Sequence, residues 1–263
     1  MVKIISVANQ KGGVGKTTTS INLATSLSAI NKKILLIDAD PQGNASTGIG
    51  ISYEERSPNL YDLIVGEALD ERAIKNTIVP GLDIITSNTN LAASEIELAE
   101  IKNREFVLSN ILSKIKDYDY VLIDCPPALG LLTINALVAS NSIIIPLQSE
   151  FFALEGISSL VNSIELIRES FNPNLFIEGI LLTMVDKRNT LSSLVEKDVR
   201  NHFGEIVYKT TIPRNVTISE APSHGKPAIL YDVNSSGSMA YIGLAREIIN
   251  KNGSKTWIKK IRS

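Results

Sequence analysis

The sequence predicts an α/β fold of the doubly wound type, with a mainly parallel sheet and helices on both of its faces. Short apolar runs alternate with segments of helical period along the chain. These runs are almost continuously apolar, as expected for parallel strands that are buried on both faces. A chain of 263 residues is long enough for one such sheet and its helices. We therefore expect one domain over residues 1–250, followed by a basic tail over 251–263.

Seven apolar runs have the length and composition of strands. The first contains Ile4, Ile5 and Val7, and the second has its apolar residues at 34–37. Such runs are rich in β-branched and long aliphatic side chains, which favour strands. The predicted strands are 3–8, 33–38, 82–86, 120–124, 142–147, 177–184 and 207–212.

The segments between these runs are predicted as helices. Their apolar residues recur at intervals of three and four, which places them on one face of a helix. The stretch 41–57 contains Gly43, Gly48 and Gly50 and is predicted as a surface loop. The predicted helices are 16–30, 58–66, 91–116, 130–139, 153–170, 190–203 and 238–251.

A glycine-rich turn joins the first strand to the first helix and predicts a nucleotide-phosphate site. Such a turn directs successive backbone N–H groups to one point, where the helix dipole also favours negative charge. Lys16 adds a positive charge for the β- and γ-phosphates, and Thr17 offers its hydroxyl to Mg²⁺. The residues of this turn expected to bind ATP are Lys11, Gly12, Gly13, Val14, Gly15, Lys16, Thr17 and Thr18.

Acidic residues follow two of the predicted strands, at the sheet edge where ligands bind in open α/β folds. Asp124 follows the apolar residues 120–123 in a Walker B arrangement, and we expect it to hold Mg²⁺ through water. Asp38 and Asp40 follow the second strand and, two residues apart in extended chain, lie on the same side. We expect Asp38 to contact the magnesium shell or a switch segment.

A second lysine, Lys11, lies five residues before Lys16 in the same turn. Two ammonium groups that converge on one loop repel each other unless a polyanion lies between them. This combination resembles the deviant Walker A motif of the ParA/MinD family of P-loop NTPases. The resemblance implies that Lys11 reaches across a dimer interface to the partner's nucleotide, as an arginine finger does, and that Asp40 orients or activates the attacking water. The expected catalytic residues are thus Lys11, Lys16 and Asp40.

The resemblance covers nearly all of the chain from residue 3 to about 250 and is closest to chromosomal Soj/ParA proteins. It implies an ATPase that uses ATP and Mg²⁺, forms a homodimer on ATP binding and binds double-stranded DNA nonspecifically. It further implies release from DNA when a ParB-type centromere-binding protein stimulates hydrolysis, and it places Pro213 and Asn215 against the adenine. The segments that carry it, besides the glycine-rich turn, are 38–44, 124–137, 150–156, 179–184, 212–215 and 219–227.

Nonspecific DNA binding needs clustered Lys and Arg side chains that neutralise phosphates. The family places such residues after the strand that ends near residue 184 and beside the 212–215 turn. Thr217 stands where close relatives carry an arginine, so the second of these patches is weaker here. The candidate DNA-binding residues are Lys187, Arg188, Lys197, Arg200 and Arg214.

The basic tail offers an alternative. Residues 251–263 carry five basic side chains and no acid, so the first 250 residues carry 21 bases and 28 acids. Such a tail is either a solvated terminus or a contact with DNA or an anionic membrane. Trp257, Ile258 and Ile261 would share one side of a helix, and MinD-like proteins end in such an element. The alternative function is therefore a MinD-like, membrane-associated positioning ATPase; a binding module without turnover is a third.

The single cysteine limits the remaining classes. Cys125 follows Asp124 in an apolar strand, which indicates a small buried hydrophobe. One cysteine excludes internal disulfides and leaves a bridging iron–sulfur cluster without its paired ligands. We find no signal pattern, and no apolar run approaches the roughly 18 residues that span a bilayer. We expect a cytoplasmic, nucleoid-associated protein.

Overall fold

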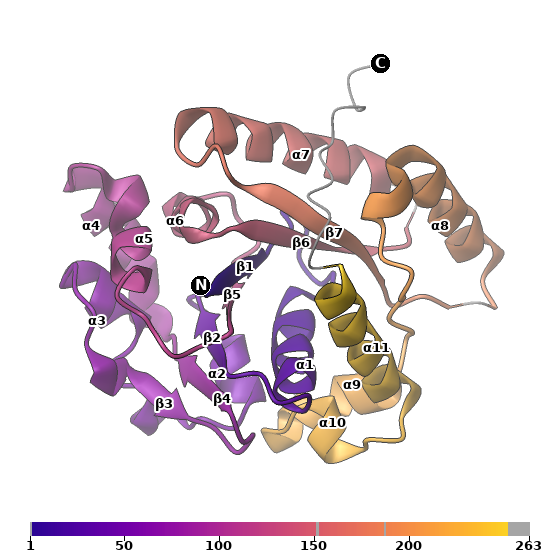
Figure 1. Cartoon of the computed structure of the whole chain (residues 1–263), viewed down its shortest axis with the longest axis horizontal. Helices are drawn as coiled ribbons and strands as arrows, with labels where there is room; N and C mark the ends of the chain where they lie inside the picture. The colour runs from indigo at the N-terminus through magenta and orange to yellow at the C-terminus, as the bar shows by residue number, and fades with distance from the viewer. Residues whose placement is uncertain (1, 151–152, 187, 252–263) are drawn as a thin grey trace.

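Seven strands form one sheet in the computed structural model, which describes residues 2–150, 153–186 and 188–251 (Figure 1). The order across the sheet is β3-β4-β2-β5-β1-β6-β7. The strands are β1 (Lys3–Val7), β2 (Ile34–Asp38), β3 (Ile74–Asn76), β4 (Leu82–Ile85), β5 (Tyr120–Asp124), β6 (Ser142–Gln148) and β7 (Phe176–Thr183).

All neighbouring strands run parallel except β3, which pairs with β4 in the antiparallel direction at one edge. The predicted doubly wound, mainly parallel sheet is therefore confirmed. Its register brings Asp38 of β2 opposite Asp124 of β5, and Asp124 opposite Val7 of β1. The carboxyl ends of three adjacent strands thus meet at one edge, directly before the segments that carry the predicted site.

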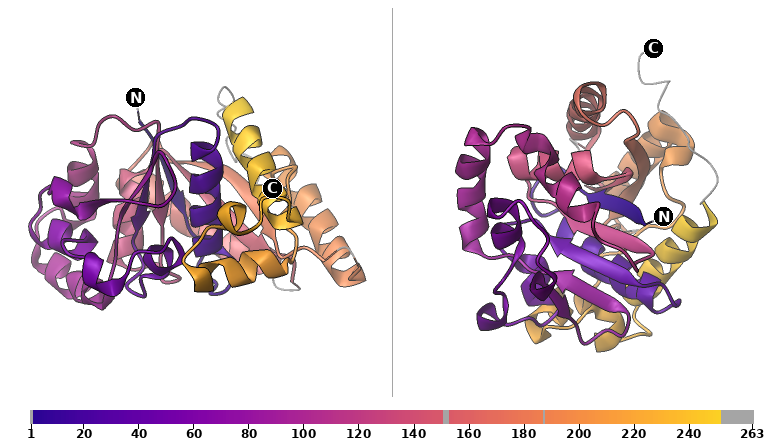
Figure 2. Two further views of the ribbon diagram at one scale, coloured as in Figure 1. Left: turned by 90° about the horizontal axis from the view of Figure 1, so that it is seen from below. Right: turned by 60° about the vertical axis from the view of Figure 1, so that its left-hand side comes forward.

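Alternate residues of the strands enter two separate hydrophobic cores, one on each face of the sheet. Leu35 and Ile37 belong to one core, and Ile34 and Leu36 belong to the other. The first core is covered by α3 to α8, and the second by α1, α2 and α11. Figure 2 shows α1 beside α11 on one side of the sheet. This two-sided burial explains why the strands are apolar throughout.

The helices have the following bounds: α1 (Lys16–Ser28), α2 (Asn44–Gly48), α3 (Leu60–Val65), α4 (Ser94–Glu100), α5 (Val107–Leu112), α6 (Leu131–Ala139), α7 (Ala153–Ser170), α8 (Thr190–Phe203), α9 (Val216–Glu220), α10 (Ala228–Tyr231) and α11 (Ser236–Asn250). None of the helices in the described ranges combines the length and the apolar character needed to cross a membrane.

The predicted strand over 207–212 is wrong. Within the described ranges, Val207 of this segment makes an isolated bridge to Ile180 of β7, and the following Pro213 makes another to Val185 beyond the end of β7, rather than a ladder. The carboxylate of Glu247 on α11 accepts hydrogen bonds from the backbone N–H groups of Lys209 and Thr210, at 2.8 and 3.0 Å. Since these donors are already bound to a side chain, they are lost to any pairing strand.

Three further predictions of secondary structure need correction. The single helix over 91–116 is divided, because α4 ends at Glu100 and Asn103 takes a left-handed conformation (φ 58°) before α5. The loop over 41–57 contains α2 and a 3-10 turn at Tyr53–Glu55. The short elements β3, α9 and α10 were absent from the prediction, since three to five residues carry too little periodic pattern.

Candidate nucleotide site

The glycine-rich turn between β1 and α1 is held in shape by contacts outside its own glycines. Gly13 and Gly15 adopt positive φ values of 74° and 88°, which side chains with a Cβ rarely take. The buried Val14 offers its carbonyl to the Thr183 hydroxyl at the end of β7, at 2.8 Å. The Lys11 backbone N–H donates to the Asn9 side chain at 3.0 Å. Among the described residues no side chain caps the start of α1, so its first N–H groups are available to an anion.

Lys16 lies buried at the start of α1, and its ammonium donates to the Lys11 carbonyl at 3.2 Å. Burial lowers the pKa of Lys16, and the nearby Asp124 carboxylate counteracts this effect. The ammonium therefore lies inside the turn and above the acidic strand ends, as a phosphate-binding lysine requires.

Asp124 is fully buried, and only one of its two carboxylate oxygens has a hydrogen-bond partner among the described residues. Oδ1 accepts from the Ser20 hydroxyl at 2.9 Å, whereas Oδ2 is buried without a partner. Burial and the facing Asp38 raise the pKa of Asp124, and the hydroxyls of Thr17 and Ser20 oppose that rise. An unpaired, buried carboxylate oxygen beside a threonine hydroxyl is an unfavourable arrangement that a hard cation such as Mg²⁺ would satisfy. The donor set predicted for the metal, Thr17 and Asp124, therefore fits it.

Asp38 binds the segment that follows its own strand. Its Oδ2 accepts from the backbone N–H and the hydroxyl of Ser46, at 2.8 and 2.7 Å, and its Oδ1 accepts from the Asp40 N–H at 3.3 Å. Burial raises the pKa of Asp38, and the Ser46 bonds lower it. Both oxygens are thus engaged by residues 40–46; the predicted contact with the magnesium shell stays a prediction.

Asp40 lies at the tip of the turn after β2 and is 8 % exposed. Its Oδ1 accepts from the Gln42 N–H, and its carbonyl accepts from the Gly43 N–H, both at 2.9 Å. Asp40 is near enough to Lys16 and Asp124 to influence their pKa values, and it raises both. The turn after β2 thus places the Asp40 carboxylate beside the glycine-rich turn.

The Lys11 side chain forms an ion pair with Glu150, which follows β6. The side chains of Lys11 and Glu150 are 55 % and 47 % exposed. Our sequence reasoning missed Glu150, although the segment 150–156 was among those that carry the family resemblance. The pair shows that a single subunit leaves the Lys11 ammonium at its surface.

A hollow of about 100 Å³ connects the glycine-rich turn with the turn after residue 212. Gly15 and Thr18 line it from one side, and Pro213 and Asn215 line it from the other. Asn215 is also the N-cap of α9, where its side chain accepts from the Ile218 N–H at 3.2 Å. The structure therefore brings the two predicted adenine-contacting residues to the phosphate loop. Other lining residues, which the sequence did not indicate, are Thr183, Met184 and Tyr241.

The candidate DNA-binding residues that the structure describes do not form one patch of free charge. Arg188 is 90 % exposed but forms an ion pair with Asp186 at 2.9 Å, and that guanidinium lowers the pKa of Asp186. Arg214 lines a hollow of about 310 Å³ together with Arg188 and Asp186. Lys197 is exposed on α8. Lys187 lies outside the described residues, as does the tail over 252–263.

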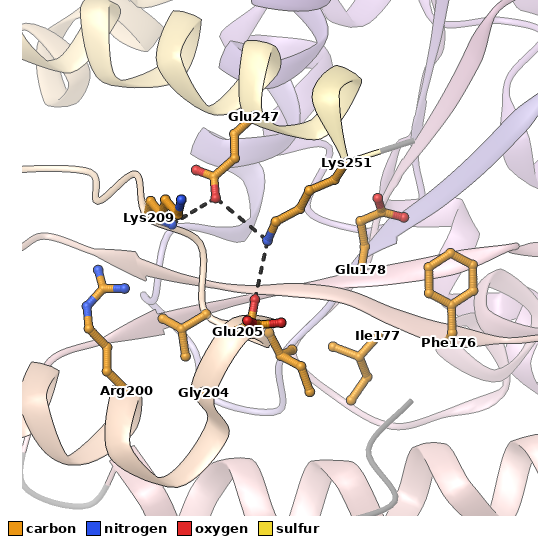
Figure 3. Close-up of a pocket in the computed structure, with 11 residues that line it drawn as sticks. Phe176, Ile177, Glu178, Arg200, Gly204, Glu205, Lys209, Glu247 and Lys251 are labelled. Atoms are coloured by element: carbon orange, nitrogen blue, oxygen red, sulfur yellow. Dashed lines mark hydrogen bonds and ion pairs between the residues drawn. The ribbon is translucent and has the colours of Figure 1, made fainter. Parts of the chain in front are cut away.

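Arg200 has structural partners. Its guanidinium binds Glu196 at 2.9 Å and the Tyr208 carbonyl at 3.0 Å. It lines a separate hollow of about 480 Å³ between the start of β7 and the ends of α8 and α11 (Figure 3). There Lys251 lies beside Glu247 and 4.4 Å from the centre of the Tyr208 ring. No residue of the glycine-rich turn lines this hollow, so it is distinct from the nucleotide site.

Comparisons with known proteins agree with this geometry. Residues 2–177 match the family model described as an AAA domain. The chain is 53 % identical over 253 residues to the chromosome partitioning protein ParA of Caulobacter vibrioides, covering 95 % of each chain. It is 52 % identical over 249 residues to the sporulation initiation inhibitor protein Soj of Bacillus subtilis, covering 94 % of this chain and 98 % of that one. Among solved structures, cobyrinic acid a,c-diamide synthase from Mycobacterium smegmatis with bound ATP analog and magnesium is similar with a TM-score of 0.85 and 32 % identity, over 97 % of this chain and 98 % of that one.

Proposed function

This chain belongs to the AAA-domain family and to the ParA/Soj family of partitioning ATPases, and from that premise we propose that it moves DNA by cycling between a monomer and an ATP-bound dimer. In this cycle two subunits close around two molecules of ATP, and the dimer binds double-stranded DNA nonspecifically. Hydrolysis, stimulated by a ParB-type partner, separates the subunits and releases the DNA. The protein would accordingly be found with the nucleoid.

The observation that carries the proposal is the contrast between the two lysines of the glycine-rich turn. Lys16 is buried inside its own site, whereas Lys11 is half exposed and pairs with the surface acid Glu150. A second ammonium at the surface is of no use to the subunit's own phosphates. It is available to the phosphates of a subunit that approaches the same face, where it would stabilise the charge that develops during transfer.

Within one subunit, the described residues have separate roles in hydrolysis. Lys16 and the N–H groups of the turn bind the phosphates, and the hollow lined by Pro213 and Asn215 takes the base. Thr17 and Asp124 would hold Mg²⁺, which supplies charge neutralisation at the phosphates. Asp40 accepts a hydrogen bond from the attacking water and directs it. Because the phosphates lack the Lys11 ammonium of the partner subunit until the dimer forms, we expect slow hydrolysis by the monomer.

DNA binding is supported by the exposed Arg214, Arg188 and Lys197, although Arg188 must first exchange Asp186 for a phosphate. Such exchange makes binding strongly dependent on salt. The dimer would double every one of these contacts, so we expect these few basic residues to bind DNA only in the ATP state.

The deciding experiment measures the mass of the wild type and of Asp40→Ala by light scattering, with and without ATP, Mg²⁺ and DNA. We expect Asp40→Ala to bind ATP and to remain a DNA-bound dimer, because the water is no longer directed, while the wild type dissociates as it turns over. Glu100→Ala, an exposed acid on α4, is the matched control and should behave as the wild type. A variant Asp40→Ala that stays monomeric at saturating ATP, or hydrolyses ATP normally, contradicts the proposal.

A further inference from the structure

Arg56 is a buried arginine that holds three separate stretches of backbone. It is 6 % exposed. Its Nη1 donates to the carbonyls of Gly43 and Ser87, at 3.4 and 3.3 Å. Its Nη2 donates to the Thr47 hydroxyl at 2.7 Å and to the Ile51 carbonyl at 3.1 Å, and its Nε donates to the same carbonyl at 3.3 Å. All three guanidinium nitrogens therefore have partners.

None of these partners is an acid, and the ion pairs found among the described residues do not include Arg56. A buried charge without a counter-charge is unfavourable unless neutral dipoles compensate it. The planar guanidinium can do so because it directs five N–H groups in a fixed fork, which the single ammonium of lysine cannot. Burial of this charge costs free energy, so the presence of an arginine here indicates that the backbone conformation it holds is needed.

What Arg56 shapes is the turn that carries Asp40. The Gly43 N–H donates to the Asp40 carbonyl at 2.9 Å, and the Gly43 carbonyl accepts from Arg56. Gly43 has a φ of 64°, and a Cβ built on it would lie 2.5 Å from Nη1 of Arg56 and 2.9 Å from the Ser87 carbonyl. The guanidinium thus packs directly against the backbone of the turn, at a place where only glycine fits.

The same turn is also held by Asp38. Its carboxylate binds Ser46, and the Ser46 hydroxyl accepts from the Ser87 N–H at 3.0 Å, while the Ser87 carbonyl accepts from Arg56. Ser87 follows β4, so the network ties the turn to the neighbouring strand. Asp38 from the sheet and Arg56 from the loop together enclose residues 40–47.

We propose that Arg56 is a positioning residue for ATP hydrolysis, which fixes the turn at 40–47 so that the Asp40 carboxylate addresses the attacking water. This inference rests on the proposed function and adds a residue to it. Misplacement of a reacting group by about 1 Å can lower a rate by about a hundredfold. A looser turn should therefore affect hydrolysis much more than ATP binding, which depends on the glycine-rich turn.

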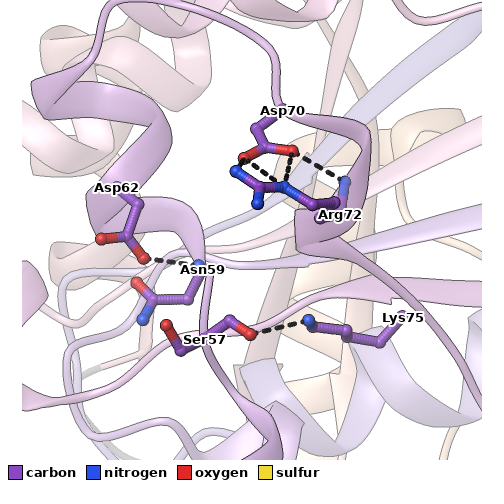
Figure 4. A network of polar contacts seen from close by, with 6 residues as sticks. All are labelled: Ser57, Asn59, Asp62, Asp70, Arg72 and Lys75. Atoms are coloured by element: carbon purple, nitrogen blue, oxygen red, sulfur yellow. Dashed lines mark hydrogen bonds and ion pairs between the residues drawn. The ribbon is translucent and has the colours of Figure 1, made fainter.

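The test compares Arg56→Lys with Arg72→Lys, a matched change on the same side of the protein. Arg72 forms an exposed ion pair with Asp70 at 2.7 Å and is 82 % exposed, so its loss should change little (Figure 4). Steady-state phosphate release gives kcat, a fluorescent ATP analogue gives Kd, and urea unfolding reports stability. We expect Arg56→Lys to lower kcat about tenfold or more with Kd within about twofold of the wild type, and Arg72→Lys to leave both unchanged. Should Arg56→Lys not fold, Thr47→Val removes one acceptor at an exposed position and should lower kcat in the same direction.

Two further measurements separate this inference from its premise. In the Asp40→Ala background, Arg56→Lys should lower the residual rate no further, since both changes act on one step. Hydrogen exchange of the amides at 42–46 should be faster in Arg56→Lys than in Arg72→Lys, with or without turnover. An unchanged kcat and unchanged exchange would overturn the role of Arg56, and so would a fall in kcat matched by an equal rise in Kd. A wild type without ATPase activity would instead refute the proposed function, while the exchange rates still decide whether Arg56 holds the turn.

Discussion

Removing the acid that binds Lys11 should strengthen the ATP-dependent dimer. In the single subunit Lys11 is paired with Glu150, whereas the proposed dimer needs the Lys11 ammonium at the partner's phosphates. Each subunit must therefore break this ion pair before the dimer forms. Glu150→Gln removes the charge and keeps the size of the side chain, so it lowers the cost of releasing Lys11.

The magnitude follows from the exposure of the pair. Both side chains are about half exposed, at 55 % and 47 %, and such pairs contribute about 0.2–1 kcal/mol. Two pairs break for each dimer, which gives about 0.4–2 kcal/mol. The dimer dissociation constant should therefore fall by about 2- to 30-fold in Glu150→Gln. The effect should shrink at high salt, because exposed charges are screened.

Analytical ultracentrifugation in the Asp40→Ala background, with saturating ATP and Mg²⁺, measures this constant without interference from turnover. Glu165→Gln makes the same substitution in another ion pair, with Arg168 on α7; it is the control and should leave the dimer unchanged. If Glu150→Gln weakens the dimer, then Glu150 supports the interface and does not restrain Lys11. That result would refute the reasoning.

Two further predictions concern the glycine-rich turn and the buried acids. Gly12→Val should bind nucleotide normally but fail to form a dimer in light scattering. A Cβ at Gly12 has no described atom of its own subunit within 4 Å, so we expect the added side chain to crowd the partner. An ATP-bound dimer of this variant would contradict the shared interface. Asp124→Asn should raise the free energy of unfolding of the metal-free protein at pH 8, by about 1 kcal/mol or more, while it abolishes Mg²⁺-dependent hydrolysis. The sign follows from the raised pKa values of Asp38 and Asp124 in the folded state. Above the ordinary aspartate pKa the folded protein binds more protons than the unfolded chain. Its free energy of unfolding therefore falls as the pH rises through the pKa values of the folded state. Urea titrations at pH 5 and pH 8 in EDTA measure the free energy of unfolding of both proteins. An equal increase for Asp124→Asn at the two pH values would show that charge is not the cause.

Much of the site could be read from local sequence because each of its parts is marked by a short pattern of neighbouring residues. Lys16 and Thr17 follow a glycine-rich turn, and Asp124 ends an apolar run, so position in the chain already places them at a helix start and a strand end. The pairing of Asp38 with Asp124 and the partnership of Lys11 with Glu150 could not be read in this way. They join residues about 86 and 139 positions apart, and their contact depends on strand order and on how the chain returns to the sheet edge.

The errors in secondary structure have the same origin. Residues 207–212 have the composition of a strand, but the Glu247 carboxylate from a distant helix takes the N–H groups of Lys209 and Thr210. The role inferred for Arg56 also depends on tertiary contacts, since in the sequence it is one charged residue in a loop with no motif around it.

By itself, the sequence determined the strands that are buried on both faces, the phosphate-binding turn and the acids at the strand ends, because local backbone geometry and periodic burial leave few alternatives. Only the tertiary structure decided which charges are paired, which are free and which backbone segments a buried guanidinium holds together. Those outcomes depend on distances between groups far apart in the chain, and desolvation makes the free energies of buried charges sensitive to every neighbour.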